Sequence, residues 1–412
     1  MHAELLNNKK ILVAVTGSIA VYKTLELIRL YVKAGAQVRV IMTQSAQRFI
    51  SALTFETISQ HTVLTEESEC WDKDSIYNHI AIGKWADIFV IAPASVNTIN
   101  KLRHGIADNL LTQTAIAYPQ RKLLCPAANT NMLHNAITQE SLEILQKSNY
   151  VMVEPVSKEL ACRDIGNGAM SDVEDIFYAT ARELLQEQYW SNREVVLSGG
   201  GTIEKLDDVR YISNFSSGKM ASSLALAFYL KGANVRLVST RGHENLPKTM
   251  HVVPVQSSEE MYEHLQENVH KAKKNSPKTP YLFMVAAVSD YVPENVQEGK
   301  LKKEFLGTLW KIELKQNMDI LHSLDKKDVI SVGFKAEMDE LVASSNAKNM
   351  LSKKELDVVC LNVLNDSKSF GSTQNSIELY CKNKEEAVSF SGEKLQLSLA
   401  LATHLQKEFS EQ

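Results

Sequence analysis

Hydrophobic positions near the start of the chain change from a strand pattern to a helix pattern and back. Residues 11–15 form a continuous apolar run rich in β-branched side chains, which is typical of a buried parallel strand. Apolar residues then recur with helical spacing over residues 21–32, and residues 37–42 form a second apolar run. This pattern predicts a β-α-β unit, and hence a parallel sheet covered by helices.

The same pattern returns about 180 residues later. Strands are predicted over residues 194–197 and 234–239, with a helix over residues 220–230 between them. A helical stretch that ends near residue 188 and a short polar segment come just before this second start. We therefore expect an α/β chain with two Rossmann-like three-layer domains, residues 1–190 and 191–412, and mainly parallel sheets.

Composition supports a globular protein and excludes several other classes. The 412 residues are 44% hydrophobic and 23% charged, with a net charge of -4, so a largely disordered chain is excluded. This balance does not suggest a nucleic-acid-binding protein, and the basic stretch 271–278 is predicted to be a solvated loop. No run of 18 apolar residues is present, so we expect no membrane helix.

The termini and the cysteines point to a cytoplasmic protein. Thr16-Gly17-Ser18 interrupts the first apolar run, which argues against a signal peptide. The five cysteines are odd in number and widely spaced, and they form no CxxC or Cys/His pattern. We therefore expect a reducing compartment and no structural zinc.

Small and polar residues follow three predicted strands of the first domain. Residues 16–20 join a strand to a helix, where backbone N–H groups and the helix dipole favour an anion. Residues 93–98 and 125–132 follow two further strands, and ligands bind α/β sheets at such carboxyl ends. Asn129 in the last segment could instead be an ordinary helix cap.

Most of residues 10–175 resembles the homo-oligomeric flavin-containing cysteine decarboxylases. The segments that carry the resemblance occur in the family's order: VTGSIAVYK, HIAIGKWAD, APASVNTINKLRHGIADNLL, PAANTNM and ACRDIGNGAM. His79, Asn129 and Cys162 fall on the family's catalytic histidine, asparagine and cysteine. Taken singly, His79 could be a core or surface histidine and Cys162 a structural thiol, but the joint match argues against coincidence.

The resemblance implies FMN chemistry on a C-terminal cysteine. Loss of CO2 needs an electron sink, which the flavin provides by oxidising the CH2–SH group. His79 is then implied to be the base, Cys162 the proton donor and Asn129 the group that holds the substrate carboxylate. The FMN-binding positions that the resemblance implies are Gly17, Ser18, Ile19, Thr43, Ser95, Asn97 and Asp108.

Four positions depart from the decarboxylase pattern. Ala128 replaces a methionine, Leu133 a tryptophan, Arg163 a glycine and Ala169 an arginine. We interpret these changes as altered packing. Because the arginine is missing at Ala169, the resemblance does not predict how the site closes over the substrate.

The second domain has its own set of polar segments. Three consecutive glycines in Ser198–Thr202 follow a strand and suit a backbone cradle for phosphates. Residues 214–218 are small and polar, as in a ligand-binding loop or an ordinary turn before a helix. Asp290 lies just beyond an apolar strand, Lys300 opens a basic cluster, and residues 333–337 are predicted to follow another strand.

These segments resemble the phosphopantothenate–cysteine ligases of the bacterial type that is fused to the decarboxylase. The matching segments between residue 195 and about residue 375 are LDDVRYISNFSSGKM, AAVSDY, KLKK, NMDIL, VGFKAE and FGS. In the family reaction the phosphopantothenate carboxylate attacks the α-phosphate of CTP, and cysteine then displaces CMP. The resemblance places Asn214 at the acyl-cytidylate and Lys300 at the developing phosphate charge.

Further positions match the family's nucleotide contacts, namely Met284, Val285, Ala286, Asp290, Met318, Asp319, Ile320, Leu321, Phe334 and Lys354. Met350 stands where a nucleotide-binding lysine is usual, although Lys348 could replace it, and Met318 replaces a proline. Mg²⁺ is expected with CTP, but no residue cluster identifies its ligands.

The resemblance thus predicts a bifunctional enzyme for two successive steps of coenzyme A synthesis, acting on small molecules without nucleic-acid or membrane partners. It implies decarboxylase trimers and ligase dimers, together a dodecamer. One alternative is a non-catalytic flavoprotein or regulatory subunit of the same fold, against which the retained His79, Asn129 and Cys162 argue. Another is an NAD-dependent oxidoreductase, but the glycine fingerprint of that class is missing.

Overall fold

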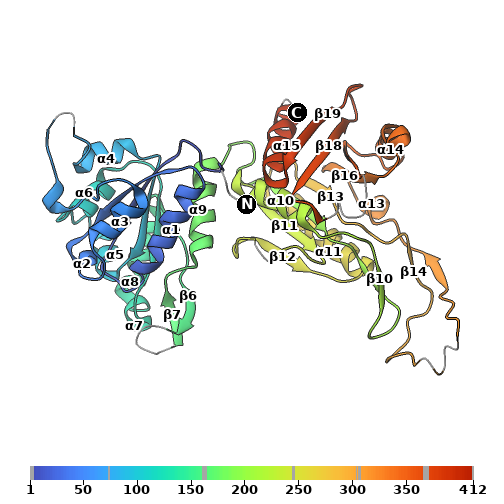
Figure 1. The fold of residues 1–412 in the computed structure, drawn as a ribbon, viewed down its shortest axis with the longest axis horizontal. Helices are drawn as coiled ribbons and strands as arrows, with labels where there is room; N and C mark the ends of the chain where they lie inside the picture. The colour runs from blue at the N-terminus through green and yellow to red at the C-terminus, as the bar shows by residue number, and fades with distance from the viewer. Residues whose placement is uncertain are drawn as a thin grey trace. The chain divides into compact units, whose positions relative to one another are not determined.

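The chain forms two compact units, Met1–Leu185 and Gln186–Gln412 (Figure 1). The computed structural model describes residues 4–72, 75–159, 165–243, 246–302, 304, 308–364 and 371–410. The predicted class is confirmed, because both units are α/β and both are built on mainly parallel sheets.

Unit 1 is organised around a five-stranded parallel sheet with the order β2-β1-β3-β4-β5. Its strands are β1 (Lys10–Val15), β2 (Gln37–Met42), β3 (Ile88–Ala94), β4 (Lys122–Pro126) and β5 (Tyr150–Met152). Residues 11–15 of β1 are all buried, as their continuous apolar run predicts. A separate antiparallel hairpin is formed by β6 (Val156–Glu159) and β7 (Ile165–Ala169).

Helices cover both faces of this sheet and make the unit three-layered. The helices are α1 (Val21–Lys33), α2 (Gln44–Gln47), α3 (Ala52–Ser59), α4 (His79–Trp85), α5 (Val96–Arg103), α6 (Leu110–Ala117), α7 (Thr130–Leu133), α8 (Ala136–Lys147) and α9 (Val173–Leu185), with a 3-10 turn η1 (Glu66–Ser68). On one face α1 packs against α9, where the rings of Tyr31 and Phe177 stack 5.9 Å apart. On the other face α4, α5, α6 and α8 bury apolar side chains against β1, β3 and β4.

Unit 2 contains an eight-stranded sheet with the order β12-β11-β8-β13-β16-β17-β18-β19. The strands are β8 (Glu194–Gly199), β11 (Asn234–Ser239), β12 (His251–Pro254), β13 (Tyr281–Met284), β16 (Ile330–Glu337), β17 (Val358–Val363), β18 (Gln374–Cys381) and β19 (Val388–Glu393). Only the pairings of β18 with β17 and with β19 are antiparallel in this sheet. The parallel strands therefore share one carboxyl edge, at which β18 begins.

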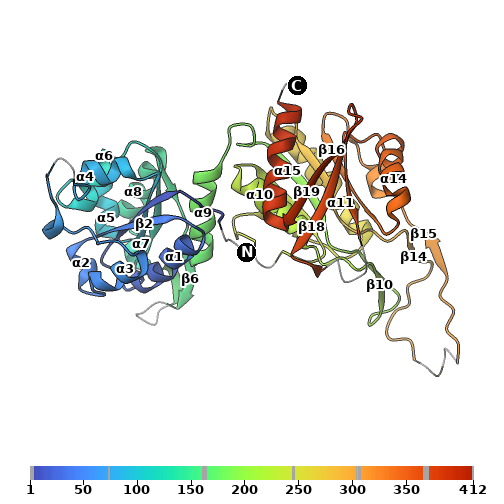
Figure 2. The ribbon, with the colours of Figure 1, turned by 45° about the horizontal axis from the view of Figure 1, so that its top comes forward.

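Helices of unit 2 also lie on two faces (Figures 1 and 2). They are α10 (Lys219–Leu230), α11 (Ser258–Asn275), α13 (Ile320–Ser323), α14 (Glu340–Lys353) and α15 (Lys394–Phe409). One core joins α11, α13 and α14 to the sheet, while α10 packs against α15. Two small ribbons, β9 (Ile203–Lys205) with β10 (Tyr211–Ser213) and β14 (Tyr291–Pro293) with β15 (Leu314–Gln316), complete the unit.

Two local predictions were wrong. Residues 333–337 belong to β16 instead of following it, because the buried run continues into a parallel pairing with β17. The basic stretch predicted as a loop is helical from Lys271 to Asn275, since buried Val269 and Ala272 keep it on the core face of α11. Within the described parts of the chain, no helix has the length and apolar character needed to cross a bilayer.

Candidate functional site

The carboxyl edge of the unit 1 sheet gathers most of the predicted FMN-binding residues. The strand order reverses direction between β1 and β3, and α/β sheets bind ligands at such a switch point. Gly17, Ser18 and Ile19 follow β1, Thr43 follows β2, and Ser95 and Asn97 follow β3. The topology therefore brings these three segments, which are far apart in the sequence, to one edge.

Hydrogen bonds hold these segments together. The Thr16 hydroxyl donates to the Pro93 carbonyl at 2.7 Å and accepts from the Ser95 N–H at 2.9 Å. The Thr43 N–H donates to the Val15 carbonyl at 3.1 Å. A Cβ atom at Gly17 would lie 2.6 Å from the Cβ atom of Ser45, so the turn after β1 reaches the turn after β2 only without a side chain.

Hydroxyl side chains and helix N-termini make this edge suitable for an anionic ligand. Ser95 caps α5 by accepting from the Thr98 N–H at 3.4 Å, and Ser18 accepts from the Ala20 N–H at 3.3 Å at the start of α1. Asn97 is exposed beside them, and Ile19 is 56% exposed. Helix N-termini and hydroxyl donors are the groups that bind phosphate in doubly wound folds, so the donor set fits a phosphorylated flavin.

Asp108, the remaining predicted FMN contact, forms an ion pair. Its carboxylate accepts from Lys101 Nζ at 2.6 Å and from the Asn109 amide at 3.0 Å. The hydrogen bond from Lys101 is the main reason that the pKa of Asp108 lies below its usual value. Asp108 is therefore anionic and stands just before α6.

Asn129 lies at the end of β4 and contacts the start of the short helix α7. Its side-chain oxygen accepts from the Asn131 N–H at 2.9 Å, so Asn129 caps α7 through this oxygen. The adjacent Ala128 N–H donates to the Gly168 carbonyl at 2.9 Å. A Cβ atom at Gly168 would lie 2.1 Å from the Ala128 carbonyl oxygen, so the hairpin rests directly on this segment.

Cys162 lies outside the described residues. In the sequence it falls between β6 and β7, whose base is the part of the hairpin that contacts Ala128. The hydroxyl of Thr130 next to Asn129 is buried and has no hydrogen-bond partner among the described residues. A buried hydroxyl without a partner is costly, so this site suits a polar ligand.

His79 is the first residue of α4, and its surroundings are well defined. Its Nδ1 atom lies 3.1 Å from a Glu69 carboxylate oxygen, and its ring contacts Trp71 edge-on with ring centres 5.2 Å apart. This contact involves Nδ1 and orients the imidazole ring. Glu69 and Trp71 belong to none of the quoted motifs, so nothing in the sequence singled them out.

Within one chain, the helix that begins with His79 is separate from the helix that Asn129 caps. In both Figure 1 and Figure 2, α4 lies well away from α7 and from the hairpin of β6 and β7. The helix α4, which begins with His79, and the helix α7, which Asn129 caps, therefore lie in separate parts of unit 1.

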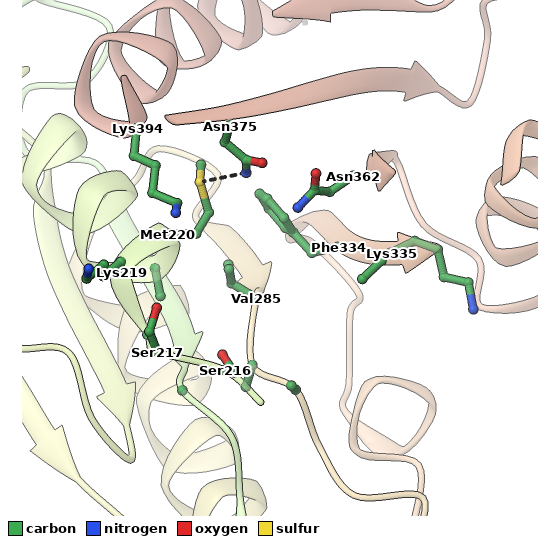
Figure 3. Close-up of a pocket in the computed structure, with 16 residues that line it drawn as sticks. Ser216, Ser217, Lys219, Met220, Val285, Phe334, Lys335, Asn362, Asn375 and Lys394 are labelled. Carbon is green, nitrogen blue, oxygen red and sulfur yellow. Dashed lines mark hydrogen bonds between the residues drawn. The ribbon is translucent and has the colours of Figure 1, made fainter. Parts of the chain in front are cut away.

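Unit 2 contains a pocket of about 190 Å³ at the carboxyl edge of its sheet (Figure 3). Its walls come from the loop before α10 and the start of that helix, the segment after β13, the strands β16 and β17, the start of β18 and the first residue of α15. Among the lining residues are Ser216, Ser217, Lys219, Phe334, Asn375 and Lys394. Gly218 has φ +72°, a conformation that glycine adopts at little cost and that turns this loop into α10.

Three lysines line the pocket; Lys335 pairs with Glu337 at 3.3 Å, and Lys219 and Lys394 make the pocket electropositive. Lys394 is buried and donates to the Ser372 carbonyl, and Lys219 Nζ donates to the Gly371 carbonyl at 2.8 Å. Burial, and secondarily the charge of Lys219, lower the pKa of Lys394. Because a buried cation at the first residue of a helix is unfavourable without a counter-charge, Lys394 indicates an anionic ligand.

Three of the predicted nucleotide contacts line this pocket, namely Val285, Ala286 and Phe334. Asn214 lies beside them, and its amide donates to the carbonyls of Ala287 at 3.4 Å and Val288 at 3.1 Å. The loop that resembles the acyl-cytidylate segment is thus tied to the strand end that resembles a nucleotide-binding segment.

The other predicted nucleotide contacts do not line the pocket. Met284, Ile320 and Leu321 are buried in the core, so their side chains face away from solvent. Asp319 pairs with Lys354 at 2.9 Å; burial opposes its ionisation, but this hydrogen bond brings the pKa of Asp319 below its usual value. Asp290 and Met318 are exposed, and the Asp290 carbonyl accepts from the Asn317 N–H at 2.8 Å.

Lys300 is exposed on a segment that the LDDVR motif holds in place. Asp208 accepts from the Gly299 N–H at 2.8 Å, and Asp207 accepts from the Leu301 N–H at 3.2 Å. The departure at Met350 is also accounted for, because its methyl group packs against Gly333 with the core.

Comparison with known proteins identifies the relatives of both units. A family model described as Flavoprotein matches residues 1–185, and one described as DNA/pantothenate metabolism flavoprotein C-terminal domain matches residues 190–409. The Coenzyme A biosynthesis bifunctional protein CoaBC of Haemophilus influenzae is 37% identical over 408 residues, which are 97% of this chain and 98% of the relative.

Two solved structures are each similar to one part of the chain. A PPC decarboxylase variant complexed with pantothenoylaminoethenethiol is 34% identical, covers 42% of this chain and 96% of its own, and has a TM-score of 0.38. The C-terminal domain of a coenzyme A biosynthesis bifunctional protein CoaBC is 25% identical, covers 55% of this chain and 100% of its own, and has a TM-score of 0.44. Since the family models and the curated relative span both units, the chain belongs to the family of bifunctional coenzyme A biosynthesis proteins.

Proposed function

We propose that this protein catalyses two successive steps of coenzyme A synthesis. Unit 2 joins cysteine to 4'-phosphopantothenate with CTP, and unit 1 decarboxylates the resulting 4'-phosphopantothenoylcysteine to 4'-phosphopantetheine with FMN. The observation that carries the proposal is the similarity to a bifunctional relative over 97% of this chain. The separate polar sites of the two units support it, because each site fits one of the two reactions.

In unit 1, the residues after β1, β2 and β3 would hold FMN, with its phosphate at the N-termini of α1 and α5. Bound FMN supplies the electron sink that loss of CO2 requires. The Asn129 amide binds the substrate carboxylate. Because this amide carries no charge, it orients the carboxylate without the strong ground-state stabilisation that a lysine would give.

His79 takes a proton from the substrate, and Cys162 returns one to the product. The contact of Glu69 with Nδ1 orients the imidazole, and Nε2 is the nitrogen that takes this proton in the proposal. Since α4 lies away from the hairpin, we propose that the predicted trimer places His79 of one copy near the hairpin of the next.

In unit 2, Lys219 and Lys394 bind an anionic group of the substrates in the pocket. A carboxylate oxygen of 4'-phosphopantothenate forms a bond to the α-phosphorus of CTP, and pyrophosphate leaves. The cysteine nitrogen then bonds to the acyl carbon, and CMP leaves. Asn214 orients the acyl-cytidylate, and Lys300 neutralises the phosphate charge that develops. Mg²⁺ accompanies CTP, and the preference for CTP over ATP is part of the proposal.

Exposed apolar side chains on the two ribbons of unit 2 support the predicted ligase dimer. Tyr211 on β10 is 55% exposed, Tyr291 on β14 is 57% exposed and Leu314 on β15 is 44% exposed. Such a patch is typical of a surface that another protein chain covers. We propose that a second copy covers it and that dimers and trimers combine into a cytoplasmic dodecamer.

The proposal is tested with purified protein, CTP, 4'-phosphopantothenate and cysteine. We expect a flavin absorption spectrum, cysteine-dependent CMP formation, and CO2 release from supplied 4'-phosphopantothenoylcysteine. Lys394→Gln should lower kcat/KM for CMP formation by about tenfold or more, as expected for a lost charge-assisted contact. Its CO2 release should stay unchanged, and Lys273→Gln on the surface of α11 should change neither activity.

A well-folded protein without flavin, or one that releases no CO2, would contradict the decarboxylase assignment. Normal CMP formation by Lys394→Gln would remove the pocket from the ligase mechanism.

A further inference from the structure

Three side chains with metal-binding atoms meet at the far end of β18 and α15. Cys381 is the last residue of β18, and His404 and Glu408 lie one turn apart on α15. One ligand atom from each, a sulfur, an imidazole nitrogen and a carboxylate oxygen, lie within 4.8 Å of one another. The proposed function uses none of these three residues.

Cys381 is buried and His404 and Glu408 are half-buried, and one polar atom of the cluster has no hydrogen-bond partner in the part of the chain that the structure describes. Cys381 is 7% exposed, and the Glu408 side chain is 17% exposed. The Nε2 atom of His404 is buried and has no hydrogen-bond partner among the described residues. The ring of Phe390 on β19 contacts the imidazole edge-on, with centres 5.6 Å apart, and closes one side. A buried imidazole nitrogen without a partner beside a thiol and a carboxylate indicates a missing ligand.

We propose that Cys381, His404 and Glu408 form a binding site for a divalent transition metal ion and that zinc is the ion that fits best. Thiolate, imidazole and carboxylate are all zinc ligands, whereas Mg²⁺ and Ca²⁺ bind almost only oxygen. Around tetrahedral zinc, such ligand atoms lie about 3.3–3.6 Å apart, so the side chains must close by roughly 1 Å. The fourth position is left for water.

In the ion-free site, the positive charge of Lys384 balances the Glu408 carboxylate, as a bound metal ion would. It follows β18 and forms an ion pair with Glu408. Because the Lys384 side chain is 50% exposed, it can turn into solvent when a metal ion binds. Binding also releases the Cys381 thiol proton to solvent, since the thiolate is the ligand.

The site lies at the edge of the sheet opposite to the ligase pocket. Cys381 pairs with Val358 at the start of β17, whereas Asn375 in the same strand lines the pocket. Lys394 in the pocket and His404 are ten residues apart on α15, which is about 15 Å along a helix. The metal is therefore not part of the ligase chemistry and instead fixes α15 to β18 as a structural ion.

The test uses full-length, tag-free protein that has been treated with a chelator and then dialysed against a zinc buffer. Elemental analysis should find about one zinc per wild-type chain, as for a three-ligand site. Cys381→Ser and His404→Ala should each lose this zinc. The matched controls are Cys70→Ser and His264→Ala. Cys70 is a free cysteine outside the cluster, and His264 lies outside it on α11, where it pairs with Glu267 at 3.8 Å. Both controls should keep this zinc.

Lys384→Gln gives an independent readout that does not depend on losing a core side chain. This substitution removes the competing cation, so zinc should bind several-fold more tightly to Lys384→Gln than to wild type. In a separate measurement, zinc should raise the Tm of wild type more than the Tm of Cys381→Ser. Unchanged zinc content in both Cys381→Ser and His404→Ala overturns the site. An affinity that stays the same or falls in Lys384→Gln also overturns it.

Discussion

The Asp207 carboxylate organises the segment that carries Lys300. It accepts hydrogen bonds from the N–H groups of Val209 at 2.8 Å, Arg210 at 2.7 Å and Leu301 at 3.2 Å, and it pairs with the Arg210 guanidinium. Arg210 in turn donates to the Leu301 carbonyl at 2.9 Å and stacks on Trp310 at 4.4 Å. One side chain thus links the long ligase motif to the basic cluster 91 residues and more away in sequence.

We predict that Asp207→Asn lowers kcat for CMP formation by roughly 10- to 100-fold, because small displacements of a catalytic group cost this much. The Arg210 hydrogen bond is the main cause that depresses the pKa of Asp207 below its ordinary 3.8. The stabilisation by ionised Asp207 is therefore fully present above about pH 4 and is lost as the pH falls toward the folded pKa. Acid unfolding should show that the stability difference between wild type and Asp207→Asn shrinks below pH 4. A difference that is constant over this range would contradict the prediction.

In the proposed mechanism Glu69 is a positioning residue, because it contacts Nδ1 of His79 at 3.1 Å. Glu69→Gln should lower the rate of CO2 release by at least about tenfold, because the neutral amide no longer holds the imidazole tautomer. The flavin content should stay unchanged, and the pH–rate profile should shift, which a purely structural role would not cause. The exposed neighbour Glu67 on η1 provides the control Glu67→Gln, which should behave as wild type.

Side chains were predictable where a long motif fixes them and not where the fold alone brings them together. The motifs predict Asn214 and Phe334 as substrate and nucleotide contacts; Phe334 lines the pocket, and Asn214 donates to the Val288 carbonyl in the segment after β13. Lys394 belongs to none of the quoted motifs. It lines the same pocket as Met220 but lies 174 residues later in the sequence, on another helix. Cys381 and His404 likewise form no recognisable Cys/His spacing in the sequence, because one is on a strand and the other on a helix.

The hairpin of β6 and β7 depends on close packing at its base. Gly168→Ala would place a Cβ atom 2.1 Å from the Ala128 carbonyl oxygen, so the hairpin must move away from Asn129. We predict a loss of CO2 release of about tenfold or more with FMN still bound, because the turns after β1, β2 and β3 stay intact. A Cβ atom at Gly83 in α4 meets nothing closer than 3.9 Å.

Gly83→Ala is therefore the matched control, and it should keep CO2 release and stabilise α4 by about 0.5–1 kcal/mol. Steady-state CO2 release and flavin absorbance measure both variants. Normal decarboxylation by Gly168→Ala would show that the hairpin does not have to rest on the Asn129 segment.

Strands and helices were mostly predictable because each buried face repeats at its own period. The prediction failed where two signals overlap. In β16 the apolar run stops at Val332, but pairing with β17 continues the strand through Phe334 and Lys335. In α11 the many lysines suggested a loop, although the apolar spacing needed for a helix was still present.

Each unit has its own hydrophobic core, and this has a measurable consequence. The core of unit 1 surrounds β1, β3 and β4, and that of unit 2 surrounds β8, β13 and β17. We predict two separate calorimetric unfolding transitions. FMN should stabilise only the unit that unfolds in one transition, and CTP only the unit that unfolds in the other. Each ligand should add about 2.7 kcal/mol to the free energy of unfolding of its unit at a concentration 100 times its Kd. A single transition that both ligands shift equally would contradict independent cores.

The contribution of α15 to the ligase pocket also sets an order of events during synthesis. All strands and helices of unit 1 precede residue 186, so this unit can fold and take up its flavin while the ribosome is still translating unit 2. The ligase pocket closes only after Lys394 has left the ribosome, on the order of ten seconds or more later at elongation rates of about 5–20 residues per second. A nascent chain can therefore complete the fold of its decarboxylase unit before it completes the ligase pocket.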